Sequence, residues 1–333
     1  MKKTILALCL STLVLLAACH SADGNKPSPA QGTNYAAVDI PAFNADSAFA
    51  FTAAQLDFGF RAPGHKGHDL CAAYLEQTMR RWCDTVIVQP FNTTLWNGQA
   101  AKGKNIIASI NPSADKRVLL AAHWDSRLWA DQDPDSNNHR SPIMGANDGA
   151  SGVGALMEMA RTMAQQRPSV GIDFIFFDLE DQGTPTWGDN YDDNAWCKGS
   201  QHWAQNPHRP YYKAVYGVLF DMVGTDHPRF TKEEVSRRYA PGITKKLWEA
   251  AAAMGYSNVF VDVDTPPILD DHMYVNQIMN LPMADIVQNS PDRSFYEYWH
   301  TVRDDINSVN RQSLKLVADV TMKVIYADYP AQQ

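Results

Sequence analysis

Three apolar segments, each with the length of a buried strand, end in residues that can bind a metal ion or transfer a proton. The segments are RVLLAAH (117–123), IDFIFF (172–177) and YGVLF (216–220). The polar residues at or just after their ends are His123, Asp125, Asp178, Glu180, Asp181 and Asp221. In open α/β sheets, ligands bind outside the carboxyl ends of the strands, so we expect these side chains to converge on one site.

The expected site concentrates negative charge and therefore requires a counter-charge. Carboxylates that lie close together resist ionisation, and burying them without partners costs several kcal/mol. Arg127 is the only basic residue near them in the sequence, and Asp148 adds a further carboxylate from the Gly-rich turn GANDGASGVG. A divalent cation would balance this charge. The histidine favours zinc, which accepts mixed nitrogen and oxygen ligands.

Each of these motifs alone also has an ordinary structural explanation. The pair His123 and Asp125 can occur by chance on a surface, and an acidic cluster after a strand is often a solvated loop or a helix cap. Asp178 is expected to be structural. The order of the motifs across three strand ends favours a metal site for hydrolysis or acyl transfer.

The elements that must position these residues follow from hydrophobic periodicity. We expect strands at 85–91, 104–110, 117–123, 172–177, 212–223, 259–263 and 283–288. We expect helices at 44–60, 68–82, 152–166, 243–255, 272–279 and 313–329. Apolar strands that alternate with helices predict an α/β fold, with a mixed, largely parallel central sheet and helices on both faces.

Residues 1–18 are predicted to form a signal peptide. Lys2 and Lys3 precede an apolar stretch that is too short to span a bilayer comfortably. The sequence LAAC at 16–19 resembles a bacterial lipobox, which implies cleavage before Cys19 and a lipid on its thiol. Acyl chains would then anchor the protein to a membrane without a spanning helix. The alternative is a plain secretory signal with an incidental cysteine.

The rest of the chain is predicted to comprise a lipidated, flexible tether at 19–34 and a single catalytic domain at 35–333. Such a protein would be an exported bacterial lipoprotein, membrane-anchored and periplasmic. Loss of Lys2 and Lys3 changes the formal net charge from −8 to −10, and an acidic surface argues against nucleic acid as a partner. No C-x-x-C motif occurs, so a cysteine zinc site is not expected. A disulfide framework is not expected either, because Cys71, Cys83 and Cys197 cannot all pair internally, and Cys71 and Cys83 would lie too far apart on one continuous helix.

Five motifs in a fixed order resemble the M28 family of zinc aminopeptidases and its glutaminyl cyclase branch. The motifs are HWD at 123–125, GANDGASG at 145–152, the pair Glu180-Asp181, Asp221 and His300. The resemblance extends from about residue 60 to about residue 310 and implies a zinc aminopeptidase-like α/β fold.

The resemblance also implies a role for each motif residue. Glu180 would act as the general acid and base. Asp125 would orient His123 or a neighbouring residue without binding the metal itself. The residues that would bind one zinc ion are Asp148, Asp181 and His300.

Two further motifs, ILDDHMYV at 268–275 and YWHTVRDD at 298–305, resemble the glutaminyl cyclase branch in particular. There, Asp221 and Asp270 would act beside the substrate as a hydrogen-bonded acidic pair. The residues expected to wall the substrate pocket are Trp187, Ile268, Leu269, Phe295 and Trp299. The implied reaction cyclises the N-terminal Gln of peptides or proteins to pyroglutamate and releases ammonia.

Two other functions remain open on the sequence alone. Every ligand of a two-zinc aminopeptidase is present, since His123 and Asp221 would hold a second ion with Asp148 bridging. Such an enzyme would remove N-terminal residues from peptides. The third reading is a non-catalytic binding lipoprotein. Glu180 argues against it, because a site that only binds a ligand has no use for a general base there.

Overall fold

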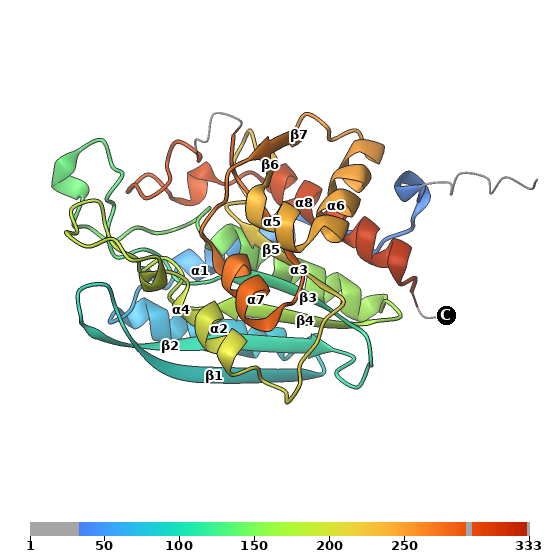
Figure 1. Cartoon of the computed structure of the whole chain (residues 1–333), viewed down its shortest axis with the longest axis horizontal. Helices are drawn as coiled ribbons and strands as arrows, with labels where there is room; N and C mark the ends of the chain where they lie inside the picture. The colour runs from blue at the N-terminus through green and yellow to red at the C-terminus, as the bar shows by residue number, and fades with distance from the viewer. Residues whose placement is uncertain (1–32, 291–294, 332–333) are drawn as a thin grey trace, which may run out of the picture. The chain divides into compact units, whose positions relative to one another are not determined.

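A six-stranded sheet forms the centre of the fold, with the strand order β1-β2-β4-β3-β5-β8 (Figure 1). Its strands are β1 (Thr85–Thr94), β2 (Ala100–Ile110), β3 (Arg117–His123), β4 (Gly171–Phe177), β5 (Tyr216–Asp221) and β8 (Met283–Val287). β4, β3, β5 and β8 run parallel, whereas β1 pairs with β2 and β2 with β4 in antiparallel fashion. This computed structural model, which describes residues 33–290 and 295–331, confirms the predicted mixed, largely parallel sheet.

Helices cover both faces of the sheet (Figure 1). One face packs against α1 (Ala45–Leu56), α2 (Lys66–Met79), α3 (Ala150–Gln165), α6 (Pro241–Ala253) and α8 (Arg311–Asp328). The other face packs against α4 (Lys198–Gln205) and α7 (Asp271–Met279). α5 (Glu234–Tyr239) follows β6 (Phe230–Glu233), which pairs in parallel with β7 (Phe260–Thr265) in a separate two-stranded sheet. Short 3₁₀ helices lie at Tyr35–Ala37, Ser136–Asn138, Asp193–Ala195 and Ile306–Ser308.

Alternation along β3 shows how the sheet is buried on both sides. Val118, Leu120 and Ala122 pack into the larger apolar cluster, which contains α3 and α8. Leu119 and Ala121 pack into the smaller cluster with residues of α4 and α7. All residues of β3 and β4 are buried, as continuous apolar strands covered on both faces require.

The predicted strands and helices are all present, with ends that differ by a few residues. β7 does not join the central sheet, because it pairs with β6, and Phe260 packs against Phe230 at a ring separation of 5.1 Å. The sequence patterns missed β6, α4 and α5. These elements are only 4, 8 and 6 residues long, too short for a clear periodicity.

Residues 1–32 lie outside the described residues. They include the predicted signal peptide, Cys19 and nearly all of the tether, which therefore stay predictions. Residues 34–333 form one compact unit. Within the described ranges, no helix is long and apolar enough to cross a membrane. Cys71, Cys83 and Cys197 are free thiols, so the part of the chain that the structure describes contains no disulfide.

A buried ion pair joins β3 to β4 near their amino-terminal ends, on the opposite side of the sheet from the carboxyl ends of these strands. Arg117 donates to both oxygens of Asp173, from Nε at 2.6 Å and from Nη2 at 2.5 Å. Ser109 and Tyr212 donate to the same carboxylate at 2.5 and 2.7 Å. Burial raises the pKa of Asp173, but the bonds from Arg117 outweigh burial and hold the pKa below its usual value. The pair therefore stabilises the fold only while both partners are present.

Replacing Asp173 by Asn is expected to lower the free energy of unfolding by about 3 kcal/mol, because Arg117 would stay buried without its counter-charge. Urea unfolding followed by circular dichroism measures this change. Glu76→Gln is the control, since it breaks an exposed ion pair with Arg80 and should cost less than about 1 kcal/mol. Equal stabilities of Asp173→Asn and wild type would contradict the assignment.

Candidate metal centre and active site

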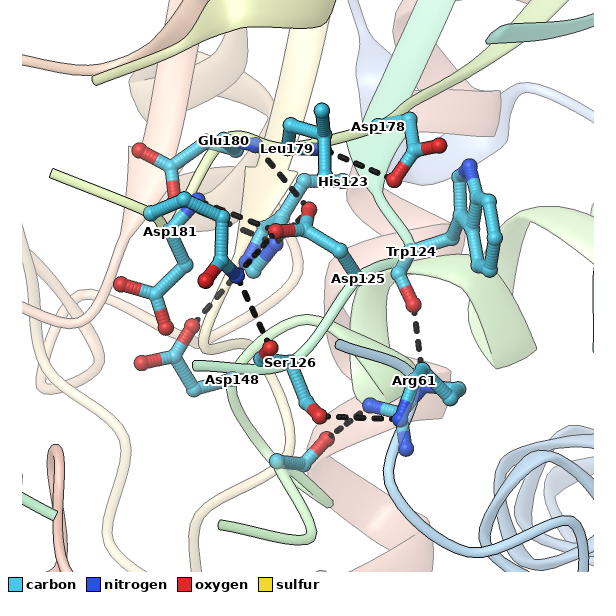
Figure 2. Close-up of polar contacts among 12 residues, drawn as sticks. Arg61, His123, Trp124, Asp125, Ser126, Asp148, Asp178, Leu179, Glu180 and Asp181 are labelled. Atoms are coloured by element: carbon cyan, nitrogen blue, oxygen red, sulfur yellow. Dashed lines mark hydrogen bonds and ion pairs between the residues drawn. The ribbon is translucent and has the colours of Figure 1, made fainter. Parts of the chain in front are cut away.

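The carboxyl ends of β4, β3 and β5 lie side by side, because these strands are parallel neighbours in the sheet. His123, the last residue of β3, is in register with the last residue of β4. Tight turns after β3 and β4 and the turn before α3 add further side chains to this edge (Figure 2). The residues that meet there are His123, Asp125, Asp148, Glu180, Asp181 and Asp221. The structure thus brings together the side chains that the strand ends predict, except Asp178, which bonds His68 Nε2 at 2.9 Å and does not line the cavity.

Asp148, Asp181 and His300 offer three ligand atoms that lie within 4.8 Å of one another. His300 Nε2 lies 3.0 Å from Asp181 Oδ1 and 3.7 Å from Asp148 Oδ2, and all three side chains are at most 4% exposed. Asp148 Oδ2 and Asp181 Oδ2 have no hydrogen-bond partner among the described residues. Buried carboxylate oxygens of this kind need a cation, and two carboxylates with one imidazole form a donor set that fits zinc.

A buried network of charges supports this triad. Asp131 Oδ1 lies 3.3 Å from His300 Nδ1, and Arg127 donates to the two oxygens of Asp131 at 2.7 and 2.9 Å. Arg127 also donates to the carbonyl oxygen of Asp181 at 2.9 Å. Burial raises the pKa of Asp131, but His300 and Arg127 reverse this effect and hold the pKa well below its usual range. A carboxylate on the far nitrogen of a metal-binding imidazole fixes the orientation of the ring.

Asp125 organises the turn that carries the predicted base. Its Oδ1 accepts the Glu180 N–H at 3.0 Å, and its Oδ2 accepts the Asp181 N–H at 3.2 Å (Figure 2). Gln182 Nε2 adds a third bond at 2.9 Å, and His123 Nδ1 lies 3.4 Å from Oδ1. Asp125 is thus placed to orient both His123 and the backbone of Glu180 and Asp181.

The Glu180 side chain faces the cavity beside the triad. Burial raises its pKa well above the usual range, the charges of Asp270 and Asp181 raise it further, and His123 opposes them. A bound cation would favour the charged form and counteract part of this rise. A carboxyl group with a raised pKa can both accept a proton and return it, as a general acid and base must.

His123 contacts the carboxylates proposed for a second metal. Its Nε2 lies 3.0 Å from Asp148 Oδ1 and 3.2 Å from Asp221 Oδ1, so these residues bond one another. Burial lowers the pKa of His123, but hydrogen bonds to Asp125, Asp148 and Asp221 outweigh burial and raise the pKa well above its usual value. Gly149 allows this packing, because a Cβ at that position would lie 2.4 Å from His123 Nε2.

The predicted hydrogen bond between Asp221 and Asp270 is absent from the part of the chain that the structure describes. Asp270 caps α7 and accepts the Asp271 N–H at 2.5 Å, its side chain forms a hydrogen bond with that of Asp285, and Asp221 turns toward His123. Both carboxylates nevertheless line the cavity. Burial, and then the charge of Asp221, raise the pKa of Asp270 to about 7.

The cavity in front of the triad has a volume of about 630 Å³. As predicted, its lining includes Ile268, Leu269, Phe295 and Trp299. Trp187 is not among the described residues that line it, so its place in the substrate pocket stays a prediction. Its ring stacks on His139 at 6.2 Å and lies under the Arg140 guanidinium at 4.8 Å.

The indole that the sequence analysis missed is Trp196. It lines the cavity, and its ring stacks on His300 at an interplanar angle of 9°. Trp299 also stacks on His300, at 3.8 Å between ring centroids. Trp196 begins the sequence WCKGSQHWA at 196–204. Nothing in this local pattern distinguishes an indole that lines a cavity from one that packs in the core.

Glu233, at the end of β6, supports the loop that carries the apolar wall of the cavity. Its carboxylate accepts hydrogen bonds from Val235 N at 2.7 Å and from Ser236 N, and it bonds His272 Nε2 at 3.1 Å. It also accepts the Ile268 N–H at 3.4 Å. Burial raises the pKa of Glu233, but His272 and the donors at the start of α5 lower it to about 2.

Comparison with known proteins places this site in a family. Residues 105–325 match peptidase family M28. The chain belongs to this family. A solved glutaminyl cyclase from Tannerella forsythia has 46% sequence identity and a TM-score of 0.84, with 86% of this chain and 99% of that chain covered. A solved Zn-dependent exopeptidase from Parabacteroides distasonis has 44% identity and a TM-score of 0.85 at the same coverage.

Among curated M28-like relatives, glutaminyl-peptide cyclotransferase from Bos taurus is 25% identical over 238 residues. The match covers 63% of this chain and 62% of the bovine protein, so the chain spans about three fifths of that relative's length. Membership of this family, with the Zn-dependent exopeptidase as a neighbour, suggests zinc as the metal. This agrees with the donor set of Asp148, Asp181 and His300.

For this M28 protein, Glu180→Gln is expected to keep the zinc content of the wild type, because Glu180 is not a metal ligand in this arrangement. Asp181→Asn should lose most of the zinc, since it removes a charged ligand oxygen. Elemental analysis of the purified variants by plasma mass spectrometry measures both. Loss of zinc from Glu180→Gln, with retention in Asp181→Asn, would reverse the two assignments.

The lowered pKa of Glu233 predicts a pH-dependent contribution to stability. A depressed pKa stabilises the fold above the unfolded value of 4.5, and this contribution disappears as the pH falls toward about 2. Glu233→Gln should therefore be less stable than wild type by about 3 kcal/mol at neutral pH, with the difference shrinking between about pH 5 and pH 2. Urea titrations across this range measure it, and a difference that is independent of pH would refute the assignment.

Proposed function

We propose that the chain is a zinc-dependent glutaminyl-peptide cyclotransferase, which cyclises the N-terminal Gln of peptides or proteins and releases ammonia. The observation that carries this proposal is the position of Asp270. It lies in the cavity wall with a carboxylate oxygen within 4.8 Å of one from Glu180. Two facing carboxyl groups can hold an α-amino group, which is the nucleophile in this reaction. The 46% identity to the Tannerella forsythia glutaminyl cyclase also supports the proposal.

Glu180 performs the proton transfers. It accepts a proton from the substrate α-amine, which attacks the side-chain amide carbon of the same Gln residue. A new C–N bond closes a five-membered ring, and the bond from that carbon to the amide nitrogen breaks. Glu180 returns the proton to this nitrogen, which leaves as ammonia. A carboxyl group whose pKa is raised by burial suits both transfers.

The cavity walls supply the geometry of the reaction. The nucleophile belongs to the substrate itself, so the site has to fold the Gln side chain back and exclude water. Ile268, Leu269, Phe295 and Trp299 provide an apolar surface for this purpose. Asp221 and Asp270 remain at the same wall, where either can orient the α-amino group.

We propose one zinc ion, held by Asp148, Asp181 and His300. When bound, zinc supplies Lewis-acid polarisation of the amide that is attacked. His123 and Asp221 bond each other at 3.2 Å, so these two groups do not need a second cation to balance them.

A second candidate function is that of an M28 di-zinc aminopeptidase. The grouping of His123, Asp148 and Asp221 within 4.8 Å favours it, because the same atoms would suit a second metal. Glu180 would then activate a water molecule that attacks the first peptide bond. The two functions yield different products, since only cyclisation leaves the peptide at full length.

We also propose that the protein is an exported lipoprotein, anchored to a membrane through Cys19 and located in the periplasm. The charged start, the short apolar stretch and the LAAC sequence at 16–19 support this proposal. A tether at 19–34 would then leave the catalytic domain free to meet Gln-initiated peptides.

A Gln-initiated peptide incubated with the zinc-loaded protein is expected to lose the mass of one ammonia molecule and no residue. Mass spectrometry of the products measures this. The same peptide with an acetylated amino terminus is the control, because a blocked amine cannot attack. Glu180→Gln should lower kcat by about 100-fold or more. Release of a free first amino acid would instead identify the aminopeptidase reaction.

A further inference from the structure

The thiol of Cys197 lies against the carboxylate of Glu180. Cys197 Sγ is 3.3 Å from Glu180 Oε1, and the Cys197 residue is 0% exposed. The nearest charged nitrogen, His123 Nδ1, is 3.9 Å from the other oxygen, Oε2. In the described ranges, no other donor forms a hydrogen bond with either carboxylate oxygen of Glu180. The thiol is therefore the contact that fixes the direction of this side chain.

The backbone holds Cys197 at this place. Its φ of 54° is in the left-handed region, which residues other than Gly adopt only where their surroundings demand it. The Cys197 N–H donates to the Glu180 carbonyl at 2.8 Å, and the Lys198 N–H donates to the Leu179 carbonyl at 3.0 Å. These two hydrogen bonds hold the start of α4 against the turn after β4.

The chemistry of a thiol suits a base that must also act as an acid. Burial raises the pKa of the Cys197 thiol well above its usual value, and the charges of Glu180, Asp271 and Asp270 raise it further, so the group stays an S–H donor. A thiol donates only weakly, whereas a hydroxyl forms short, strong bonds with a carboxylate. A weak donor restrains one oxygen without strongly favouring the ionised form.

We infer that Cys197 is a positioning residue for the cyclisation reaction. Its S–H donates to Glu180 Oε1 and leaves Oε2 to take the proton from the substrate amine. This inference rests on the proposed function, in which Glu180 is the general acid and base.

Steady-state kinetics of the zinc-loaded protein tests the inference. Cys197→Ala is expected to lower kcat about 3- to 10-fold, as the loss of one weak hydrogen bond would, with unchanged KM and zinc content. Cys197→Ser restores a donor and should recover part of kcat. Cys71→Ala is the matched control, because Cys71 is also 0% exposed but lies on α2 in the apolar core. Unchanged kcat in Cys197→Ala, an effect on KM alone, or no recovery in Cys197→Ser would overturn the inference.

Infrared spectroscopy tests the contact without turnover. The S–H stretching band of Cys197, assigned by its loss in Cys197→Ser, should lie at lower frequency than the Cys71 band. It should move to higher frequency in Glu180→Gln, because a neutral amide is a weaker acceptor than a carboxylate. An S–H stretching frequency of Cys197 that is the same in Glu180→Gln and in wild type would overturn the inference. Absence of ammonia release from the wild type would overturn the proposed function instead, and the two failures are thus distinguishable.

Discussion

The site depends on one electrostatic constraint: several buried carboxylates lie close together at one edge of the central sheet, and their negative charge has to be balanced. Parallel neighbours β4, β3 and β5 deliver them, because every strand in such an arrangement ends on the same side. Arg127 cannot neutralise the cluster alone, since both oxygens of Asp131 already accept hydrogen bonds from its guanidinium. Burial without compensation would be strongly unfavourable. A divalent cation held by Asp148, Asp181 and His300, as proposed, would balance this charge and supply the chemistry of the site.

The same chemical group takes different roles at this edge because its surroundings differ. Asp125 is surrounded by donors, and hydrogen bonds from His123 and Gln182 outweigh burial, so its pKa is lowered. Asp270 is buried beside like charges, and its pKa rises to about 7. Glu180 has few donors and faces the cavity, so it is the carboxyl group best suited to exchange a proton with a substrate.

The sequence predicted much of this because β3 and β4 are mostly apolar, fully buried strands that are followed directly by clustered polar residues. The resemblance of the motifs to family M28 then pointed to Asp148, Asp181 and His300, which the structure brings within 4.8 Å of one another. Contacts that depend on the path of the loops were not predictable. Asp131, Trp196 and Cys197 reach the site through irregular segments, and Trp187, which has the same type and a similar position in the chain, stacks on His139. Local patterns carry no information on which way such a loop turns.

Anomalous diffraction at the zinc absorption edge, from crystals of the zinc-loaded protein, tests the central claim most directly. A strong peak is expected about 2.0–2.2 Å from one donor atom of each of Asp148, Asp181 and His300. A zinc-loaded crystal with no peak at this position, or with peaks only on the surface, would contradict it.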